Sequence, residues 1–337
     1  MDSNEMMATA LALVAPGKGI LAADESTPTI TKRFKTIDLP STEENRRAYR
    51  EMLFTTPDLG DSISGVILFD ETIRQRARDG RTFLELLRSQ GIIPGIKVDK
   101  GANALANFPG EKITEGLDGL REHFKEYFDL GARFSKWRAV ITIGELSPSH
   151  NCISANAHAL ARYAALSQET GLVPIVEPEV LMDGSHTIER CKEVTEETLR
   201  IVFGQLAEHR VVLEQMLLKP NMVIAGEDCP KQAGVIEVAE ATLRCLRWTV
   251  PAAVPGVVFL SGGQSDVLAT QHLNQMNQIG NAPWQLSFSF GRALQAPALQ
   301  AWHGKDISAG QRALSLRARC NSAARYGRYG QEMEKAD

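Results

Sequence analysis

The sequence predicts an α/β protein built as a single-domain (β/α)8 barrel, the TIM-barrel fold, over residues 1–337. Eight short runs rich in Val, Ile, Leu and Phe start roughly 25 to 45 residues apart, which leaves room for a crossover helix after each. Helix signals lie between these runs, and no linker rich in Gly, Ser or Pro divides the chain. An open doubly wound sheet is the alternative, but no Gly-x-Gly-x-x-Gly motif follows the first run.

The eight apolar runs are predicted to be parallel strands, because strands buried on both faces show no alternation of polar and apolar residues. They cover residues 19–25, 65–71, 92–99, 134–140, 174–180, 217–222, 256–263 and 286–294.

Helices are predicted between the strands from their end signals. Ser41 and Glu44, like Thr82 and Glu85, have the spacing of a capping box, which marks a helix start. A helix over residues 153–170 is followed by Gly171, which suits a C-cap. Further helices are predicted over residues 117–130, 195–209, 236–248, 265–276 and 309–326, with an N-terminal helix at about 3–15 and a short C-terminal tail at about 328–337.

Composition limits the classes of function. The chain is 43% hydrophobic and carries a net charge of −4 with no basic stripe, so neither nucleic acid nor an anionic membrane is an expected partner. Its five cysteines are scattered without a Cys-x-x-Cys pair, which argues against a disulfide framework or a zinc ribbon and fits a reducing compartment. The apolar run over residues 6–15 lacks the basic flank of a signal peptide and is too short to span a bilayer. We therefore expect a cytoplasmic protein.

Lys219 stands inside an apolar run, Leu217-Leu-Lys-Pro-Asn-Met222. A buried lysine loses the hydration that stabilises its ammonium form, which favours the neutral amine that attacks carbonyl carbons. The alternative is a lysine whose head group reaches solvent at the strand end. The segment alone leaves both interpretations open.

Polar residues end most of the predicted strands, where a barrel carries its catalytic groups. Side chains two positions apart in a strand share a face, so these residues should point into one site. A single such pair would be explained by a structural salt bridge, but burying ions from six strands costs several kcal/mol for each unpaired ion. The set therefore favours a polar site for an anionic ligand. Its members are Asp24, Glu25, Ser26, Lys97, Asp99, Lys136, Arg138, Glu177, Glu179, Lys219, Asn221, Ser261, Gly262, Gly263, Ser289, Gly291 and Arg292.

Two groups of residues suit phosphate binding. The first contains Ser261-Gly-Gly-Gln-Ser265, here called the glycine turn, and Arg292, since barrels often bind phosphate between their seventh and eighth loops. The second comes from the first and third loops and contains Arg33, Lys97 and Lys100 with the hydroxyls of Ser26 and Thr29. Two basic groups across one barrel mouth indicate a substrate with a phosphate at each end.

The chain resembles class I fructose-bisphosphate aldolase through eight motifs in the same order. The resemblance implies a (β/α)8 barrel, usually a homotetramer, that cleaves fructose 1,6-bisphosphate to dihydroxyacetone phosphate and glyceraldehyde 3-phosphate in glycolysis and gluconeogenesis without a metal or other cofactor. The motifs are Leu21-Ala-Ala-Asp-Glu-Ser26, Gly65-Val-Ile-Leu-Phe69, Gly95-Ile-Lys-Val-Asp-Lys-Gly101, Lys136-Trp-Arg138, Val173-Pro-Ile-Val-Glu-Pro-Glu179, Leu217-Leu-Lys-Pro-Asn-Met222, Phe259-Leu-Ser-Gly-Gly-Gln-Ser265 and Phe288-Ser-Phe-Gly-Arg-Ala-Leu294.

The chemistry of such a cleavage assigns roles to the catalytic candidates. A protonated imine on Lys219 would accept the electrons of the broken carbon–carbon bond. Glu177 would protonate the carbinolamine, with Glu179 either a second acid or a structural partner of Lys136 or Arg138; the resemblance favours Glu177. Lys136 would keep Lys219 deprotonated by repulsion, or act only as a point charge. Asp24 would orient substrate hydroxyls and take part in proton transfer.

Some features leave alternatives open. The family's tail usually ends in a tyrosine, whereas residues 331–337 contain none and Tyr326 and Tyr329 lie upstream. Other Schiff-base barrels, such as transaldolase or deoxyribose-phosphate aldolase, should need only one phosphate site. A metal-dependent aldolase would need clustered histidines, and the seven histidines here are scattered. A catalytically inactive scaffold for acidic partners is a further alternative, against which intact Lys219 and Glu177 argue. The preference between fructose 1,6-bisphosphate and fructose 1-phosphate stays open.

Overall fold

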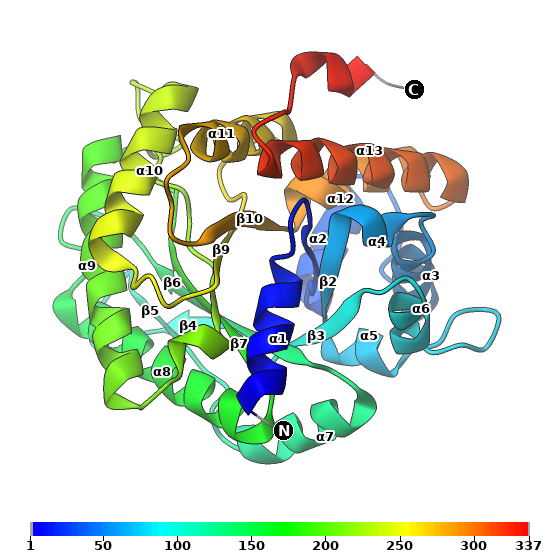
Figure 1. Ribbon diagram of the computed structural model, residues 1–337, viewed down its shortest axis with the longest axis horizontal. Coiled ribbons are helices and arrows are strands. Elements are labelled where there is room, and N and C mark those ends of the chain that lie inside the picture. The colour runs from blue at the N-terminus through cyan, green and yellow to red at the C-terminus, as the bar shows by residue number, and fades with distance from the viewer. Residues whose placement is uncertain (1–2, 336–337) are drawn as a thin grey trace.

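Eight parallel strands form a closed barrel in the computed structural model, which describes residues 3–335 (Figure 1). The strands are β1 (Gly19–Ala23), β2 (Ile63–Leu68), β3 (Ile93–Lys97), β6 (Phe134–Ile141), β7 (Val173–Val180), β8 (Leu217–Leu218), β9 (Gly256–Phe259) and β10 (Gln285–Phe290). The first strand pairs with β2 and also with β10, so the sheet has no free edge. The predicted (β/α)8 barrel is confirmed.

Helices follow the barrel strands and surround them (Figure 1). After β1 come α2 (Thr27–Lys35), α3 (Glu43–Phe54) and α4 (Leu59–Ser62), and after β2 come α5 (Asp70–Arg74) and α6 (Phe83–Ser89). The later helices are α7 (Leu120–Leu130), α8 (His150–Thr170), α9 (Ile188–Glu208), η1 (Leu213–Gln215), α10 (Val235–Thr249), α11 (Asp266–Ile279), α12 (Arg292–Trp302), α13 (Ile307–Arg325) and η2 (Gln331–Lys335). Within residues 3–335, no helix is long and apolar enough to cross a membrane.

The helix-end predictions have mixed outcomes. The capping box of Thr82 and Glu85 is present, and α8 ends at Gly171 as predicted. The capping box predicted at Ser41 is wrong. Thr42 is the N-cap of α3 and accepts a hydrogen bond from the Asn45 backbone nitrogen, while Glu44 pairs with Arg47 on the helix instead of reaching back.

Several strands are shorter than predicted, β8 and β10 among them. The Lys219 backbone nitrogen still bonds to the Val176 carbonyl oxygen at 2.8 Å, but Pro220 has no N–H to continue the ladder, so β8 stops before Lys219. At the last strand, β10 ends at Phe290 and Arg292 already begins α12. A hairpin of β4 (Ala102–Ala104) and β5 (Lys112–Thr114), which the sequence did not predict, stands in the loop after β3.

The N-terminal helix, α1 (Ser3–Leu13), covers the end of the barrel where the strands begin. A Cβ atom on Gly65 would come within 2.6 Å of Leu13 Cδ2, and one on Gly256 would come equally close to Val14 Cγ1, so the glycines make room for this contact. Inside the barrel, an apolar cluster that includes Ile175 and Leu217 continues from α1. The charged residues that line the central cavity lie at the opposite end of the barrel.

The C-terminal segment, residues 327–335, packs on the outside of the barrel beside α13 and α11 (Figure 1). Glu334 accepts two hydrogen bonds of 2.6 Å from the guanidinium of Arg317, whose side chain is 2% exposed. The Tyr329 hydroxyl also donates to Glu334, at 2.6 Å, and the Tyr329 backbone nitrogen donates to Asn274 Oδ1 at 2.9 Å. Residues 327–335 are not among those that line the central cavity.

Candidate active site

A cavity of about 290 Å³ opens at the carboxyl ends of the strands. Of the residues predicted for the site, four are not part of its wall: Asp99, Lys100, Asn221 and Gly263. The predicted residues that the structure brings together here are Asp24, Glu25, Ser26, Thr29, Arg33, Lys97, Lys136, Arg138, Glu177, Glu179, Lys219, Ser261, Gly262, Ser289, Gly291 and Arg292.

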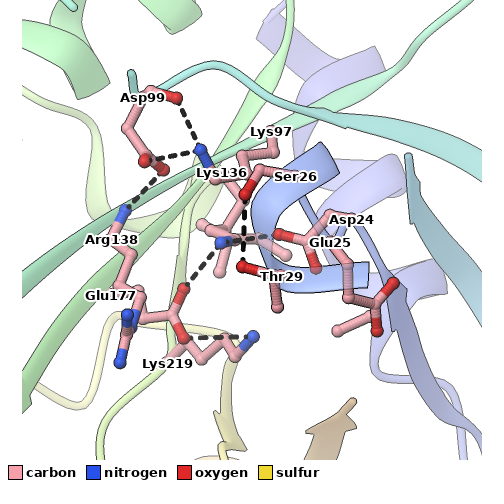
Figure 2. A network of polar contacts seen from close by, with 12 residues as sticks. Asp24, Glu25, Ser26, Thr29, Lys97, Asp99, Lys136, Arg138, Glu177 and Lys219 are labelled. Carbon is pink, nitrogen blue, oxygen red and sulfur yellow. Dashed lines mark hydrogen bonds and ion pairs between the residues drawn. The ribbon is translucent and has the colours of Figure 1, made fainter. Parts of the chain in front are cut away.

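The centre of the cavity holds an alternating row of two lysines and two carboxylates (Figure 2). Lys219 Nζ lies 3.1 Å from Glu177 Oε1, and Lys136 Nζ lies 3.2 Å from Glu177 Oε2. Lys136 Nζ also lies 2.7 Å from Asp24 Oδ2. Lys136 therefore has two close carboxylates, whereas Lys219 has one. All four side chains are at least 87% buried, and all four lie at the carboxyl ends of barrel strands, which surround the cavity.

These contacts set the charges of the row. Burial raises the pKa of Asp24, but the ammonium groups of Lys136 and Lys219 outweigh it and hold that pKa well below its usual range. Burial likewise raises the pKa of Glu177, and the same two lysines reverse the shift. For Lys136, burial lowers the pKa, but Asp24 and Glu177 more than compensate and raise it. Asp24 and Glu177 are thus carboxylates at neutral pH, and Lys136 is a cation.

Two buried oxygen atoms in the cavity lack a hydrogen bond within the described chain. They are Glu177 Oε2, whose contact with Lys136 does not have hydrogen-bond geometry, and Ser289 Oγ. Buried polar atoms in proteins are nearly always hydrogen-bonded. These two oxygens are therefore positions where a polar ligand can bind.

The glycine turn borders one side of the cavity and leads into α11. Gly263 has a φ of +71°, and a Cβ atom there would lie 2.4 Å from Met182 Cγ, so glycine is required. Arg292, which follows the neighbouring strand β10, is exposed in the first turn of α12. Backbone N–H groups at a helix start next to a guanidinium suit an anion such as phosphate.

Arg33 lies next to Gly291, on the side of the glycine turn, although the sequence grouped it with Lys97. A Cβ atom on Gly291 would be 3.6 Å from Arg33 Nη2. The ion pair with Glu25 holds the Arg33 side chain in this position. Glu25 is itself fixed by an ion pair with Arg50 at 2.5 Å and by a hydrogen bond from Gln295 at 2.8 Å.

The second group of cations is neutralised by carboxylates. Lys97 Nζ lies 2.7 Å from Asp99 Oδ1, and Arg138 pairs with Glu179. The hydroxyls of Ser26 and Thr29 are 3.2 Å apart beside them (Figure 2). An adjoining cavity of about 500 Å³, which Lys100 also lines, extends from this group towards the β4–β5 hairpin.

Glu25 and Asp99, both members of the predicted polar set, position Arg33 and Lys97. One residue that shapes the site was not predicted. Met182 packs against the glycine turn from the loop after β7, and nothing in its apolar side chain marks it in the sequence. In the described part of the chain, no three His, Cys, Asp or Glu side chains are grouped as metal ligands would be.

The fold and the cavity define a (β/α)8-barrel protein with a site for a small anionic molecule. The sequence matches the family described as "Fructose-bisphosphate aldolase class-I" over residues 5–337, and the chain belongs to this family, whose members are carbon–carbon lyases acting on a sugar bisphosphate.

Known proteins of this family are similar over nearly their whole length. The "Probable fructose-bisphosphate aldolase class 1" of Xanthomonas axonopodis pv. citri is 60% identical over 98% of this chain and 99% of its own. The "Fructose-bisphosphate aldolase 6, cytosolic" of Arabidopsis thaliana is 53% identical over 97% of this chain and 92% of its own. A solved structure of the Plasmodium falciparum aldolase, in complex with TRAP and a small-molecule inhibitor, superposes with a TM-score of 0.96 at 51% identity, covering 97% of this chain and 95% of that one.

Proposed function

We propose that this chain reversibly cleaves fructose 1,6-bisphosphate to dihydroxyacetone phosphate and glyceraldehyde 3-phosphate through a Schiff base on Lys219. The observation that supports this most strongly is the buried amine of Lys219 within 3.1 Å of the Glu177 carboxylate. A buried lysine next to a carboxylate provides both the nucleophile and the proton acceptor that imine formation needs.

Imine formation begins when Lys219 passes a proton to Glu177 and attacks the C2 carbonyl carbon. Of the two lysines next to Glu177, Lys219 has this single carboxylate partner, whereas Lys136 is also paired with Asp24, so we assign the role of nucleophile to Lys219. Glu177, now protonated, donates to the carbinolamine hydroxyl, and water leaves.

Cleavage then breaks the bond between C3 and C4. The C4 hydroxyl loses its proton to Asp24, the C4 carbon becomes an aldehyde, and the electron pair moves through C3 into the iminium to form an enamine. Lys136 remains a cation throughout and stabilises the carboxylate that transfers the proton. Protonation of the enamine at C3 and hydrolysis of the imine release dihydroxyacetone phosphate.

The two phosphates are bound at opposite sides of the cavity. The glycine turn, Gly291 and Arg292 take one of them, with Arg33 adding a charge beside Gly291. Lys97, Ser26, Thr29 and Arg138 take the other, which requires the phosphate to compete with Asp99 and Glu179 for their cations.

We also infer that the protein works in the cytoplasm, in glycolysis and gluconeogenesis, as a homotetramer without a metal. The name of the Arabidopsis relative supports the location, and the resemblance to the family supports the assembly and the pathway.

Borohydride trapping tests the mechanism. Incubation with dihydroxyacetone phosphate and borohydride should inactivate the enzyme irreversibly and attach the triose to Lys219, as mass spectrometry of a digest would show. The Lys219→Met variant should gain no adduct. An adduct on Lys136 or Lys97 of the unmodified chain would contradict the proposed role of Lys219.

A further inference from the structure

The glycine turn has few side-chain contacts to hold its shape. Gly262 and Gly263 lack side chains, and glycine loses more conformational freedom on ordering than any other residue. At the end of the turn, Ser265 Oγ caps α11 by accepting a hydrogen bond from the Leu268 backbone nitrogen at 3.1 Å. The remaining side chain of the turn after Ser261 is that of Gln264. An anion site made of backbone N–H groups binds well only if those groups are already oriented.

Gln264 is tied to His272, which lies two turns further along α11. His272 Nδ1 lies 2.6 Å from Gln264 Oε1, and the amide nitrogen of Gln264 faces the Gly262 carbonyl oxygen at 3.5 Å. His272 is 2% exposed, so its ring has a fixed place in the packing of the helix. The imidazole thus connects the body of α11 to the backbone of the turn.

The direction of this hydrogen bond follows from its partner. Because an amide oxygen can only accept, the proton must be on Nδ1 of His272. The other ring nitrogen, Nε2, is then an unprotonated acceptor, and within the described residues it is buried without a hydrogen-bond partner. Burying an unpaired polar atom costs free energy, so an apolar residue would be expected here if packing alone mattered.

We propose that His272 is a positioning residue for the phosphate bound at the glycine turn, acting through Gln264. This inference rests on the proposed function. By holding the Gln264 side chain, His272 fixes the backbone from Gly262 to Ser265 in the conformation that accepts the anion. Less conformational entropy is then lost when the substrate binds.

The test compares the two triose phosphates in the condensation direction. His272→Leu removes the donor, and the KM of the triose phosphate that uses the glycine turn should rise about 5- to 10-fold, the effect of one neutral hydrogen bond. The KM of the other triose phosphate and kcat should change less than 2-fold. His272→Asn should restore most of the affinity, because its amide N–H lies near the position of Nδ1 and can donate to Gln264.

Controls separate this role from a structural one. Asn274→Ala, on the same helix and almost as buried, removes a hydrogen bond to the Tyr329 backbone nitrogen instead and should leave both KM values unchanged. Gln264→Leu should reproduce the effect of His272→Leu, and the double variant should add nothing. Equal KM increases for both triose phosphates, or no rescue by His272→Asn, would overturn the inference. Loss of imine trapping in the unmodified enzyme would instead refute the proposed function.

Discussion

Glu177 and Glu179 are both buried carboxylates on β7, but they have different neighbours. Glu177 lies between Lys219 and Lys136, whereas Glu179 pairs with Arg138. The sequence could not choose between them as the general acid, since both occupy the same face of the same strand. The contacts favour Glu177, because it can exchange a proton directly with the proposed nucleophile.

Glu177→Gln should therefore lower kcat by about 100- to 10,000-fold, the usual contribution of a general acid–base group, with a small change in KM. The rate of borohydride trapping should fall in parallel, because imine formation is the step affected. Glu179→Gln serves as the matched control and should raise KM more than it lowers kcat. A larger kcat effect at Glu179 would reverse the assignment.

Most individual site residues could be predicted because polar residues at the ends of buried strands have few structural explanations. Lys219, Glu177, Lys136 and Asp24 stood out for this reason. The position of Arg33 beside Gly291 could not be predicted, because Arg33 lies on a helix and the direction of its side chain is decided by Glu25, which is distant from Gly291 in sequence. The tie between His272 and Gln264 was not predicted at all, since a buried histidine in a helix has no distinctive sequence pattern.

At the level of elements, the structure differs from the sequence-based prediction mainly at the ends. The strand at residues 217–222 was predicted to continue past Pro220 because its composition is apolar. Pro220 has no backbone N–H for the hydrogen bonds between strands, so the strand ends before it whatever its composition. The β4–β5 hairpin was missed because its strands are three residues long and mostly exposed. Such short pairings depend on tertiary packing, which local sequence patterns do not contain.

A separate prediction concerns Glu334 in the C-terminal segment. Glu334 has a lowered pKa: burial raises it, but hydrogen bonds from Arg317 and Tyr329 outweigh burial. A carboxylate with a depressed folded-state pKa contributes stability that is fully present above its unfolded value, near pH ~4.3, and is lost as the pH falls through the folded value. Glu334→Gln should lower the free energy of unfolding at pH 7 by about 1.5 to 3 kcal/mol, since it weakens the charge-assisted hydrogen bonds of buried Arg317, whose remaining carboxylate partner, Asp266, is 3.7 Å away.

Thermal melts at pH 7 and in acid would measure this effect, which should shrink as the pH falls below the unfolded pKa. Glu332→Gln, an exposed substitution in the same segment, should not change the melting temperature. Because the segment does not line the cavity, removing residues 331–337 should leave deuterium exchange into dihydroxyacetone phosphate unchanged relative to cleavage. Exchange that collapses only in the truncated chain would show that these residues take part in proton transfer.

At the level of the whole molecule, the proposed reaction needs no metal, because the iminium already accepts the electrons that a Lewis acid would otherwise stabilise. Dialysis against EDTA should therefore leave the cleavage rate of fructose 1,6-bisphosphate unchanged. A loss of activity that zinc restores would contradict the Schiff-base mechanism. The aldehyde product can be followed by a coupled assay in the same sample before and after dialysis.

Because α1 covers the end of the barrel where the strands begin, it also affects folding during synthesis. Val14 at the end of α1 is synthesised 242 residues before Gly256, which it contacts and which begins the late barrel strand β9. At typical synthesis rates this interval lasts roughly 10 to 60 seconds. During this interval α1 has no closed barrel to pack against, and β1 lacks β10, one of its two neighbouring strands. The apolar surface of α1 therefore stays uncovered during most of the synthesis of the barrel, and we expect ribosome-associated chaperones to bind it.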